Sequence, residues 1–153
     1  MSSPNTYGFG IIGTGMIAEF HAWAITSIER ARLVSVYSRS EDRARAFAAK
    51  VGGKPCWDLD TFFSDRELDV VTICTPSGFH LEPTVAAAKY GKHVICEKPL
   101  EVTLDRIDQM IDAHKQSGTQ LGAIFNSRYE PVNQALKKLI GTGRLGRITY
   151  GGG

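Results

Sequence analysis

A short glycine-containing segment, Gly13-Thr14-Gly15-Met16-Ile17-Ala18, constrains the fold of this chain more than any other feature. It follows an apolar run, Tyr7–Gly13, that predicts a strand, and it opens a stretch with helical spacing, Met16–Ile28. In such a turn the first glycine permits a tight bend, the second lets the backbone approach a pyrophosphate, and the alanine keeps the helix close to the sheet. The phosphates then lie at the positive end of the helix. The segment therefore predicts the first unit of a dinucleotide-binding sheet.

Strand-like and helix-like segments alternate along the rest of the chain. We expect further strands at Leu33–Ser38, Lys54–Trp57, Asp69–Thr75, His93–Glu97 and Gln120–Asn126, and further helices at Glu41–Lys50, Asp58–Asp65, His80–Tyr90, Thr103–Ser117 and Val132–Ile140. Strands separated by helices form right-handed βαβ units in a parallel sheet. We therefore predict an α/β fold, a doubly wound, Rossmann-type sheet of six strands in the order 3-2-1-4-5-6. The first helix is expected to carry an apolar side made of Ile17, Phe20, Ala24 and Ile28.

The end of the chain departs from this alternation. Residues 1–141 fit one dinucleotide-binding domain. The segment Gly143-Arg-Leu-Gly-Arg-Ile-Thr-Tyr then predicts a turn that leads into a new strand. No further strand follows with which this one could pair. We therefore expect residues 142–153 to be the start of a C-terminal substrate domain that is missing here.

Composition and charge argue against several classes of partner. Apolar residues make up 42% of the chain. The 18 basic and 16 acidic residues give a net charge of +2, and the basic residues form no block, so we expect no nucleic-acid partner. No apolar run approaches the roughly 20 residues that span a bilayer, and the N-terminus lacks a leader-like apolar region, so we expect no membrane association and a cytoplasmic location. No metal site is predicted, because the three cysteines lack C-x-x-C spacing and His21 and His114, interpreted as surface or helix-packing residues, lack ligand partners.

The residues after the second strand bear on the choice of cofactor. NAD sites place an acidic residue about 20 residues beyond the glycine turn, where it binds the ribose 2′-hydroxyl. This chain instead has Ser38, Arg39 and Ser40. An arginine pairs well with a 2′-phosphate, and the two hydroxyls can donate to it, so the segment favours NADP over NAD. In the alternative interpretation Arg39 is a solvated loop residue and Ser40 only caps the next helix.

Two other polar segments follow buried strands, at the edge where doubly wound sheets bind ligands. Thr75-Pro76 follows the fourth strand, and His80 begins the next helix, either in contact with the cofactor or as an exposed first-turn residue. Glu97-Lys98-Pro99 follows the fifth strand. A lysine here can polarise a carbonyl or give a proton to a developing alkoxide, with Glu97 holding it in position. Alternatively the pair is a surface ion pair of little consequence.

Together these motifs resemble the glucose–fructose oxidoreductase/inositol dehydrogenase (Gfo/Idh/MocA) family. The resemblance covers nearly the whole chain. Its most specific part is Gly91-Lys-His-Val-Ile-Cys-Glu-Lys-Pro-Leu, and it extends to Phe125-Asn126-Ser-Arg128-Tyr-Glu-Pro131 and Gly143-Arg-Leu-Gly-Arg-Ile.

The resemblance implies roles for individual residues. It places Lys98 at the catalytic centre, against the substrate hydroxyl and the nicotinamide ribose. Glu97 orients the cofactor, Pro99 matches a proline often found in a cis peptide, and His80, Asn126 and Arg128 lie near the nicotinamide. The full set expected to bind the cofactor is Gly13, Thr14, Gly15, Met16, Ile17, Ser38, Arg39, Ser40, Thr75, Pro76, His80, Glu97, Lys98, Pro99, Asn126 and Arg128.

The resemblance also implies hydride transfer between NAD(P) and a sugar, a cyclitol or a related alcohol or ketone. The family has a second domain that supplies most substrate contacts and often the oligomer interface. We therefore expect an oxidoreductase represented by its cofactor-binding domain, catalytically incomplete as an isolated chain, and a homo-oligomer. One alternative is a non-catalytic dinucleotide-binding sensor or regulatory module. Another is a methyltransferase that binds S-adenosylmethionine, which would not need Glu97-Lys98-Pro99. In a third alternative, the glycine turn is only a tight connection between strand and helix and binds no ligand.

Overall fold

Six parallel strands form one sheet in the order β3-β2-β1-β4-β5-β6 in the computed structural model, which describes residues 6–151. After β3, at one edge of the sheet, the chain crosses back to β4 on the other side of β1, so the strand order reverses between β1 and β4. This arrangement confirms the predicted doubly wound, Rossmann-type sheet. The strands are β1 Tyr7–Ile12, β2 Ala31–Tyr37, β3 Lys54–Cys56, β4 Val70–Ile73, β5 His93–Cys96 and β6 Leu121–Ala123.

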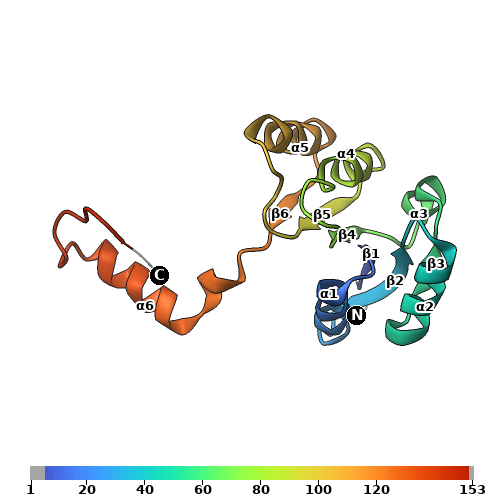
Figure 1. Cartoon of the computed structure of the whole chain (residues 1–153), viewed down its shortest axis with the longest axis horizontal. Helices are drawn as coiled ribbons and strands as arrows, with labels where there is room; N and C mark the ends of the chain where they lie inside the picture. Colours follow the sequence, from blue (N-terminus) through green and yellow to red (C-terminus); the bar gives the residue numbers. More distant parts are fainter. Residues whose placement is uncertain (1–5, 152–153) are drawn as a thin grey trace, which may run out of the picture.

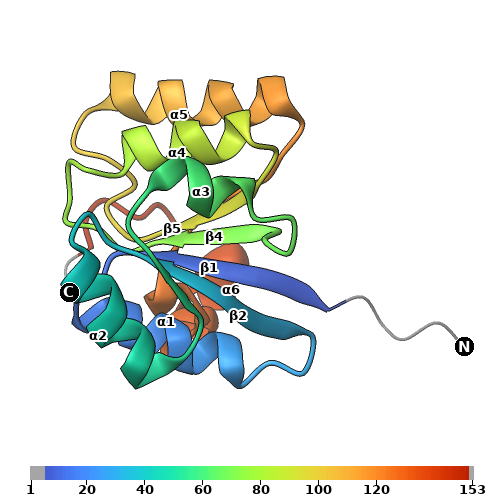
Figure 2. The same ribbon diagram turned by 90° about the vertical axis from the view of Figure 1, so that its right-hand side faces the viewer.

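Helices cover both faces of this sheet (Figure 2). Helices α3, α4 and α5 lie on one face, whereas α1 and α2 lie on the other. Each face has its own apolar core, one centred on Phe62, Phe63 and Met110 and the other on Ala18, Ala22 and Phe47. The helices are α1 Met16–Thr26, α2 Glu41–Val51, α3 Leu59–Ser64, α4 Leu81–Lys89, α5 Leu104–Ser117 and α6 Pro131–Gly141, with a 3₁₀ helix, η1, at Asn126–Tyr129.

Local capping explains several helix boundaries. The Thr103 side chain accepts a hydrogen bond from the Arg106 amide at the start of α5, and Gly118 adopts a left-handed conformation, φ 71°, at its end. Both positions agree with the prediction, because a threonine side chain satisfies an open helix amide and glycine tolerates positive φ. The Asp58 side chain caps α3 in the same way.

The side of α1 that faces the sheet differs from the prediction. Ala18, Ala22 and Ile25 are buried. The expected apolar side is exposed instead, with Phe20 59% and Ile28 55% accessible. The physical reason is distance, because small alanines let this helix lie close to the strands that end at the glycine turn.

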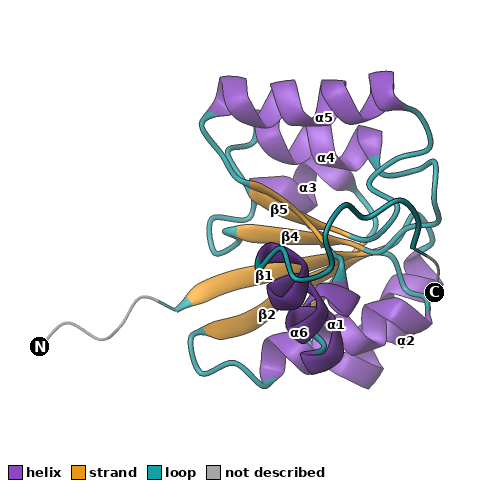
Figure 3. Ribbon diagram, turned by 90° about the vertical axis from the view of Figure 1, so that its left-hand side faces the viewer, coloured by secondary structure: helices purple, strands orange, loops and turns teal. Residues whose placement is uncertain are grey.

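The chain after β6 extends away from the sheet (Figure 1). No residue of α6 is buried, and η1 is its main neighbour. The predicted strand after α6 is wrong for the residues described: positions 142–151 form turns and irregular backbone. Figure 3 shows this segment as a loop beside α6. A strand requires a partner for its backbone groups, and nothing in residues 6–151 pairs with this segment. None of the helices described is long and apolar enough to cross a membrane.

Candidate functional site

A groove of about 1270 Å³ lies at the carboxyl ends of β1, β2 and β4. It is larger than the roughly 300–1,000 Å³ typical of pockets for drug-sized ligands, as an elongated ligand requires. Many of the predicted cofactor-binding residues line it: Gly13, Thr14, Gly15, Ile17, Ser38, Arg39, Ser40, Thr75 and Pro76. The structure thus gathers three segments of the sequence at the switch point of the sheet.

The glycine turn at one end of the groove has the geometry of an anion site. Gly13 has φ 112°, and a Cβ there would lie 2.7 Å from the carbonyl oxygen of Cys74, so only glycine fits. Gly15 is the N-cap of α1 and has open space where a side chain would be. No side chain caps the helix, so its first amides are left for an anion. This open, uncapped turn fits a pyrophosphate group.

The end of β2 supplies positive charge to the groove. Arg39 is exposed and lines it. Arg43, in the first turn of α2, also lines it, although the sequence analysis did not single it out. Its place in the first turn of the helix that directly follows Arg39 was the available signal. The Ser40 side chain accepts a hydrogen bond from the Arg43 amide at 3.4 Å, so it does cap α2, as the alternative interpretation held. Burial raises the pKa of Tyr37, which also lines the groove, although Arg39 opposes this.

The segment after β5 places a buried carboxylate next to an exposed lysine. The backbone amide of Lys98 donates to Glu97 Oε2 at 3.0 Å. Glu97 Oε1 lies 3.0 Å from His21 Nε2, so its partners are not those of a surface Glu–Lys pair. Lys98 itself is exposed and forms no ion pair with any residue from 6 to 151, so its ammonium group is open to a ligand. The Lys98–Pro99 peptide bond is cis, as the family resemblance implied for this proline.

His21 packs α1 against the sheet and against Glu97, so of the two interpretations, surface or helix-packing residue, the structure supports the second. Its side chain is only 13% exposed and contacts Glu97 as well as Thr72 of β4, the latter through Nδ1 at 2.6 Å. The available signal was its spacing, because position 21 lies three residues after Ala18 on the side of α1 that faces the sheet.

His80 has a different place from the predicted contact with the cofactor. It is 1% exposed and does not line the groove. Its Nε2 lies 2.8 Å from the carbonyl oxygen of Thr75, and its Nδ1 lies 2.9 Å from that of Pro99. The ring therefore ties the loop after β4 to the loop after β5.

Glu97, Lys98 and Pro99 do not line the groove, and the remaining predicted residues also lie outside it. Met16 is 76% exposed at the start of α1. Asn126 and Arg128 are exposed on η1, in the segment that leads away from the sheet (Figure 1). Their placement near the nicotinamide stays a prediction.

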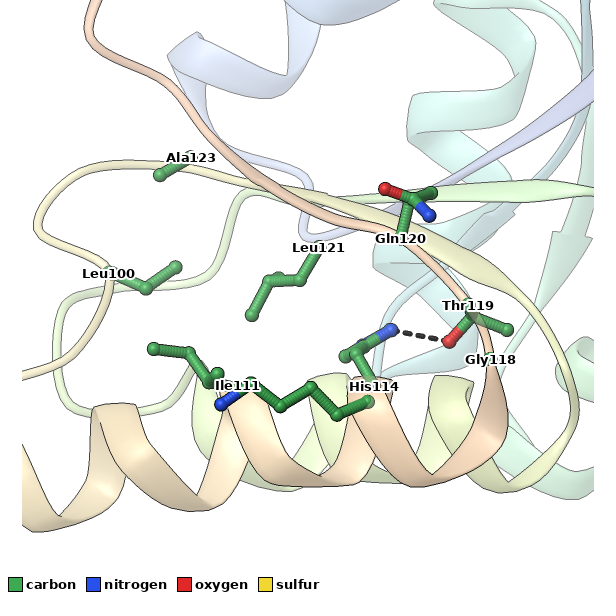
Figure 4. Close-up of a pocket in the computed structure, with 9 residues that line it drawn as sticks. Leu100, Ile111, His114, Gly118, Thr119, Gln120, Leu121 and Ala123 are labelled. Carbon is green, nitrogen blue, oxygen red and sulfur yellow. Dashed lines mark hydrogen bonds between the residues drawn. The ribbon is translucent and has the colours of Figure 1, made fainter.

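A second pocket of about 490 Å³ lies between α5 and β6 (Figure 4). Leu100, Ile111 and Leu121 give it apolar walls, and His114 Nδ1 contacts Thr119 Oγ1 at 2.6 Å. Burial lowers the pKa of His114, so this ring favours the neutral form. None of the predicted site residues lines this pocket. Within residues 6–151 no group of three His, Cys, Asp or Glu side chains could hold a metal ion.

The doubly wound sheet, the uncapped glycine turn and the groove at the switch point define a dinucleotide-binding Rossmann domain. Comparison with known families identifies which one. The model of the family described as "Oxidoreductase family, NAD-binding Rossmann fold" matches residues 7–125. This chain belongs to that family, the Gfo/Idh/MocA oxidoreductases.

Individual relatives agree with this assignment. The chain is 35% identical over 142 residues to 1,5-anhydro-D-fructose reductase of Ensifer adhaerens, covering 91% of this chain and 42% of the relative. It is 36% identical over 146 residues to scyllo-inositol 2-dehydrogenase (NADP(+)) of Bacillus subtilis, covering 93% and 44%. The WlbA dehydrogenase from Bordetella pertussis, solved with NADH and UDP-GlcNAcA, superposes with a TM-score of 0.89 at 30% identity, covering 94% and 44%. The chain thus spans less than half the length of these relatives. The comparisons give no support to a regulatory module or a methyltransferase.

Proposed function

We propose that this chain is the cofactor-binding part of an NADP(H)-dependent oxidoreductase that acts on a sugar, a cyclitol or a related alcohol or ketone. The observation that carries the choice of cofactor is the pair Arg39 and Arg43, which line the groove after β2, where NAD sites place an acid. Two guanidinium groups there suit a 2′-phosphate, because arginine binds phosphate through paired, charge-assisted hydrogen bonds.

The residues of the groove and of the segment after β5 have separate roles in this proposal. The amides at the start of α1 hold the pyrophosphate, with Gly13 and Gly15 giving it room. Thr75-Pro76 and the segment Glu97-Lys98-Pro99 would hold the nicotinamide half. Lys98, with an ammonium group free of ion pairs within residues 6–151, polarises the substrate oxygen and exchanges a proton with it. The bound cofactor supplies the hydride acceptor or donor.

The substrate, the oligomer and the location of the whole enzyme are also part of the proposal. The chain spans 42% of the reductase and 44% of the inositol dehydrogenase named above, so most substrate contacts are expected from segments outside it. Because hydride transfer depends on holding the substrate within reactive distance, we expect no turnover from these 153 residues alone. We also expect a homo-oligomer and a cytoplasmic location.

Calorimetric titration with NADPH and NADH tests the choice of cofactor. We expect tighter binding of NADPH, and a selective loss of its affinity in Arg39→Ala of roughly tenfold or more, because a hydrogen bond to a charged group contributes about 1.5–3 kcal/mol. Affinity for NADH should change little. Arg45→Ala is the matched control, since Arg45 lies on α2, pairs with Glu41 and does not line the groove. Equal affinity of the parent chain for the two cofactors would contradict the proposal.

A further inference from the structure

Side chains from three separate elements meet beneath the carboxyl end of β5. His21 of α1 lies 2.6 Å from Thr72 Oγ1 of β4 and 3.0 Å from Glu97 Oε1 after β5. Thr72 is buried, and the side chains of His21 and Glu97 are 13% and 9% exposed. One imidazole therefore joins the helix that begins at the glycine turn to the segment that carries Lys98.

The hydrogen bonds of this cluster run in one direction. Burial raises the pKa of Cys74 to about 12, so its thiol keeps its proton and can donate to Thr72 Oγ1, 3.2 Å away. In the neutral tautomer with its proton on Nε2, His21 donates to the Glu97 carboxylate, which only accepts, and His21 Nδ1 accepts from the Thr72 hydroxyl. The other Glu97 oxygen accepts from the Lys98 amide. Each carboxylate oxygen thus has a donor, and the two donors fix its orientation.

We propose that His21 is a positioning residue for the nicotinamide half of the cofactor: by holding the Glu97 carboxylate it fixes the backbone of Lys98. The proposal rests on the function proposed above and adds a residue to it. The helix that presents its first amides to the pyrophosphate also carries His21, five residues after Met16. The two halves of a bound dinucleotide would therefore be positioned by one rigid element. Without the imidazole, a buried Glu97 oxygen lacks its donor, and the segment loses its defined orientation.

Two substitutions separate positioning from packing. His21→Gln can place an amide donor near the position of Nε2 and keep the contact with Glu97. His21→Asn is shorter and can reach only the position of Nδ1, which keeps Thr72 and loses Glu97. The same two changes at His93 serve as the control. That residue lies at the amino end of β5, away from the groove, and accepts from the Gln120 amide through Nδ1.

The readout is the affinity for NADPH compared with that for adenosine 2′,5′-bisphosphate, which carries only the adenine half. We expect His21→Asn to weaken NADPH binding roughly tenfold, the loss of one charge-assisted hydrogen bond, while the bisphosphate binds as before. His21→Gln should stay within about threefold of the parent chain, and both His93 variants should bind both ligands normally. Thermal melts confirm folding of each variant.

Four other results would contradict the inference or the proposed function. If His21→Asn weakens the binding of both ligands equally, His21 only supports the fold. If the Asn and Gln variants bind NADPH with the same affinity, the contact between His21 and Glu97 does not position the cofactor. If the parent chain binds NADPH no better than the bisphosphate, the nicotinamide half gains nothing from the segment, and the inference is wrong. If the parent chain binds neither NADPH nor NADH, the proposed function itself fails.

Discussion

At the scale of single residues, the buried carboxylate of Glu101 organises the loop beside the site. Its side chain is fully buried. Oε2 accepts from the amides of His80 and Leu81 at 3.2 and 3.0 Å, and Oε1 accepts from Val102 at 2.8 Å. Arg106 adds a charged contact at 3.2 Å. The His80 side chain does not cap α4, so a residue from the loop after β5 provides this cap.

These contacts give Glu101 a pH-dependent contribution to stability. Burial by itself raises the pKa of this carboxyl, but hydrogen bonds from Val102, Leu81 and Arg106 outweigh it, and the net pKa lies below the ordinary value. The folded protein keeps Glu101 ionised where the unfolded chain has taken up a proton. The contribution is therefore complete above the ordinary pKa of about 4.3 and is lost as the pH falls through the lowered value.

We predict that Glu101→Gln lowers the free energy of unfolding at neutral pH by about 1.5–3 kcal/mol. The difference from the parent chain should shrink once the pH falls below about 4.3. Urea denaturation followed by circular dichroism at several pH values measures both effects. Glu82→Gln is the control, because Glu82 contacts the same Arg106 but is 65% exposed, and it should change stability by less than about 0.5 kcal/mol. Equal losses in the two variants would contradict this account.

At the scale of elements, helix α1 shows what the periodicity of apolar residues can predict and what it cannot. The helix itself and its start after the glycine turn were predicted from spacing, but the apolar side was misassigned. Large apolar residues such as Phe20 and Trp23 are 59% and 71% exposed, while Ala18 and Ala22 face the sheet. The prediction rested on apolar residues at helical spacing, whereas close approach to a sheet selects small residues.

The same helix carries a matched test of this packing. We predict that Ala22→Leu, which adds three carbons at a site only 3% exposed, lowers the free energy of unfolding by about 1–3 kcal/mol through overpacking. Ala24→Leu makes the identical change on the exposed side and should stay within about 0.5 kcal/mol. Chemical denaturation of the two variants gives the comparison. Equal stabilities would mean that α1 does not pack on the sheet through Ala22.

Predictions from sequence succeeded where a short motif or a general rule of topology applies. The cap at Thr103, the stop at Gly118 and the turn at Gly13 follow from short motifs, and the strand order follows from the rule for alternating strands and helices. Contacts between distant segments were missed. His21 and Glu97 are 76 residues apart, and no local pattern pairs them. The expected strand after α6 failed for a related reason, since a strand depends on a partner and residues 6–151 contain none for it.

At the scale of the whole molecule, two apolar surfaces are left without a partner within residues 6–151. One is on α1, where Phe20 and Trp23 are exposed. The other is on α6, which stands apart from the sheet (Figure 1) and has exposed apolar residues at Val132, Leu136 and Ile140. These three positions recur at helical spacing and form one stripe. Unpartnered apolar surfaces of this kind mark contact sites in soluble proteins.

We therefore predict that the chain self-associates through α6, by a symmetric contact between two copies. Leu136→Lys should yield a monomer at concentrations where the parent chain is a dimer, because a charge in the apolar stripe must be desolvated on association. Gln134→Lys adds the same charge on the opposite side of the helix and should leave the dimer intact. Sedimentation equilibrium at high micromolar protein concentration distinguishes these states. A second comparison, with a chain that ends at Ile140, isolates the last segment, in which residues 142–151 do not form the predicted strand. This shorter chain keeps the stripe and should associate like the parent. A monomeric parent chain would overturn the prediction, and a monomeric shorter chain would assign the contact to residues after 140 instead of to α6.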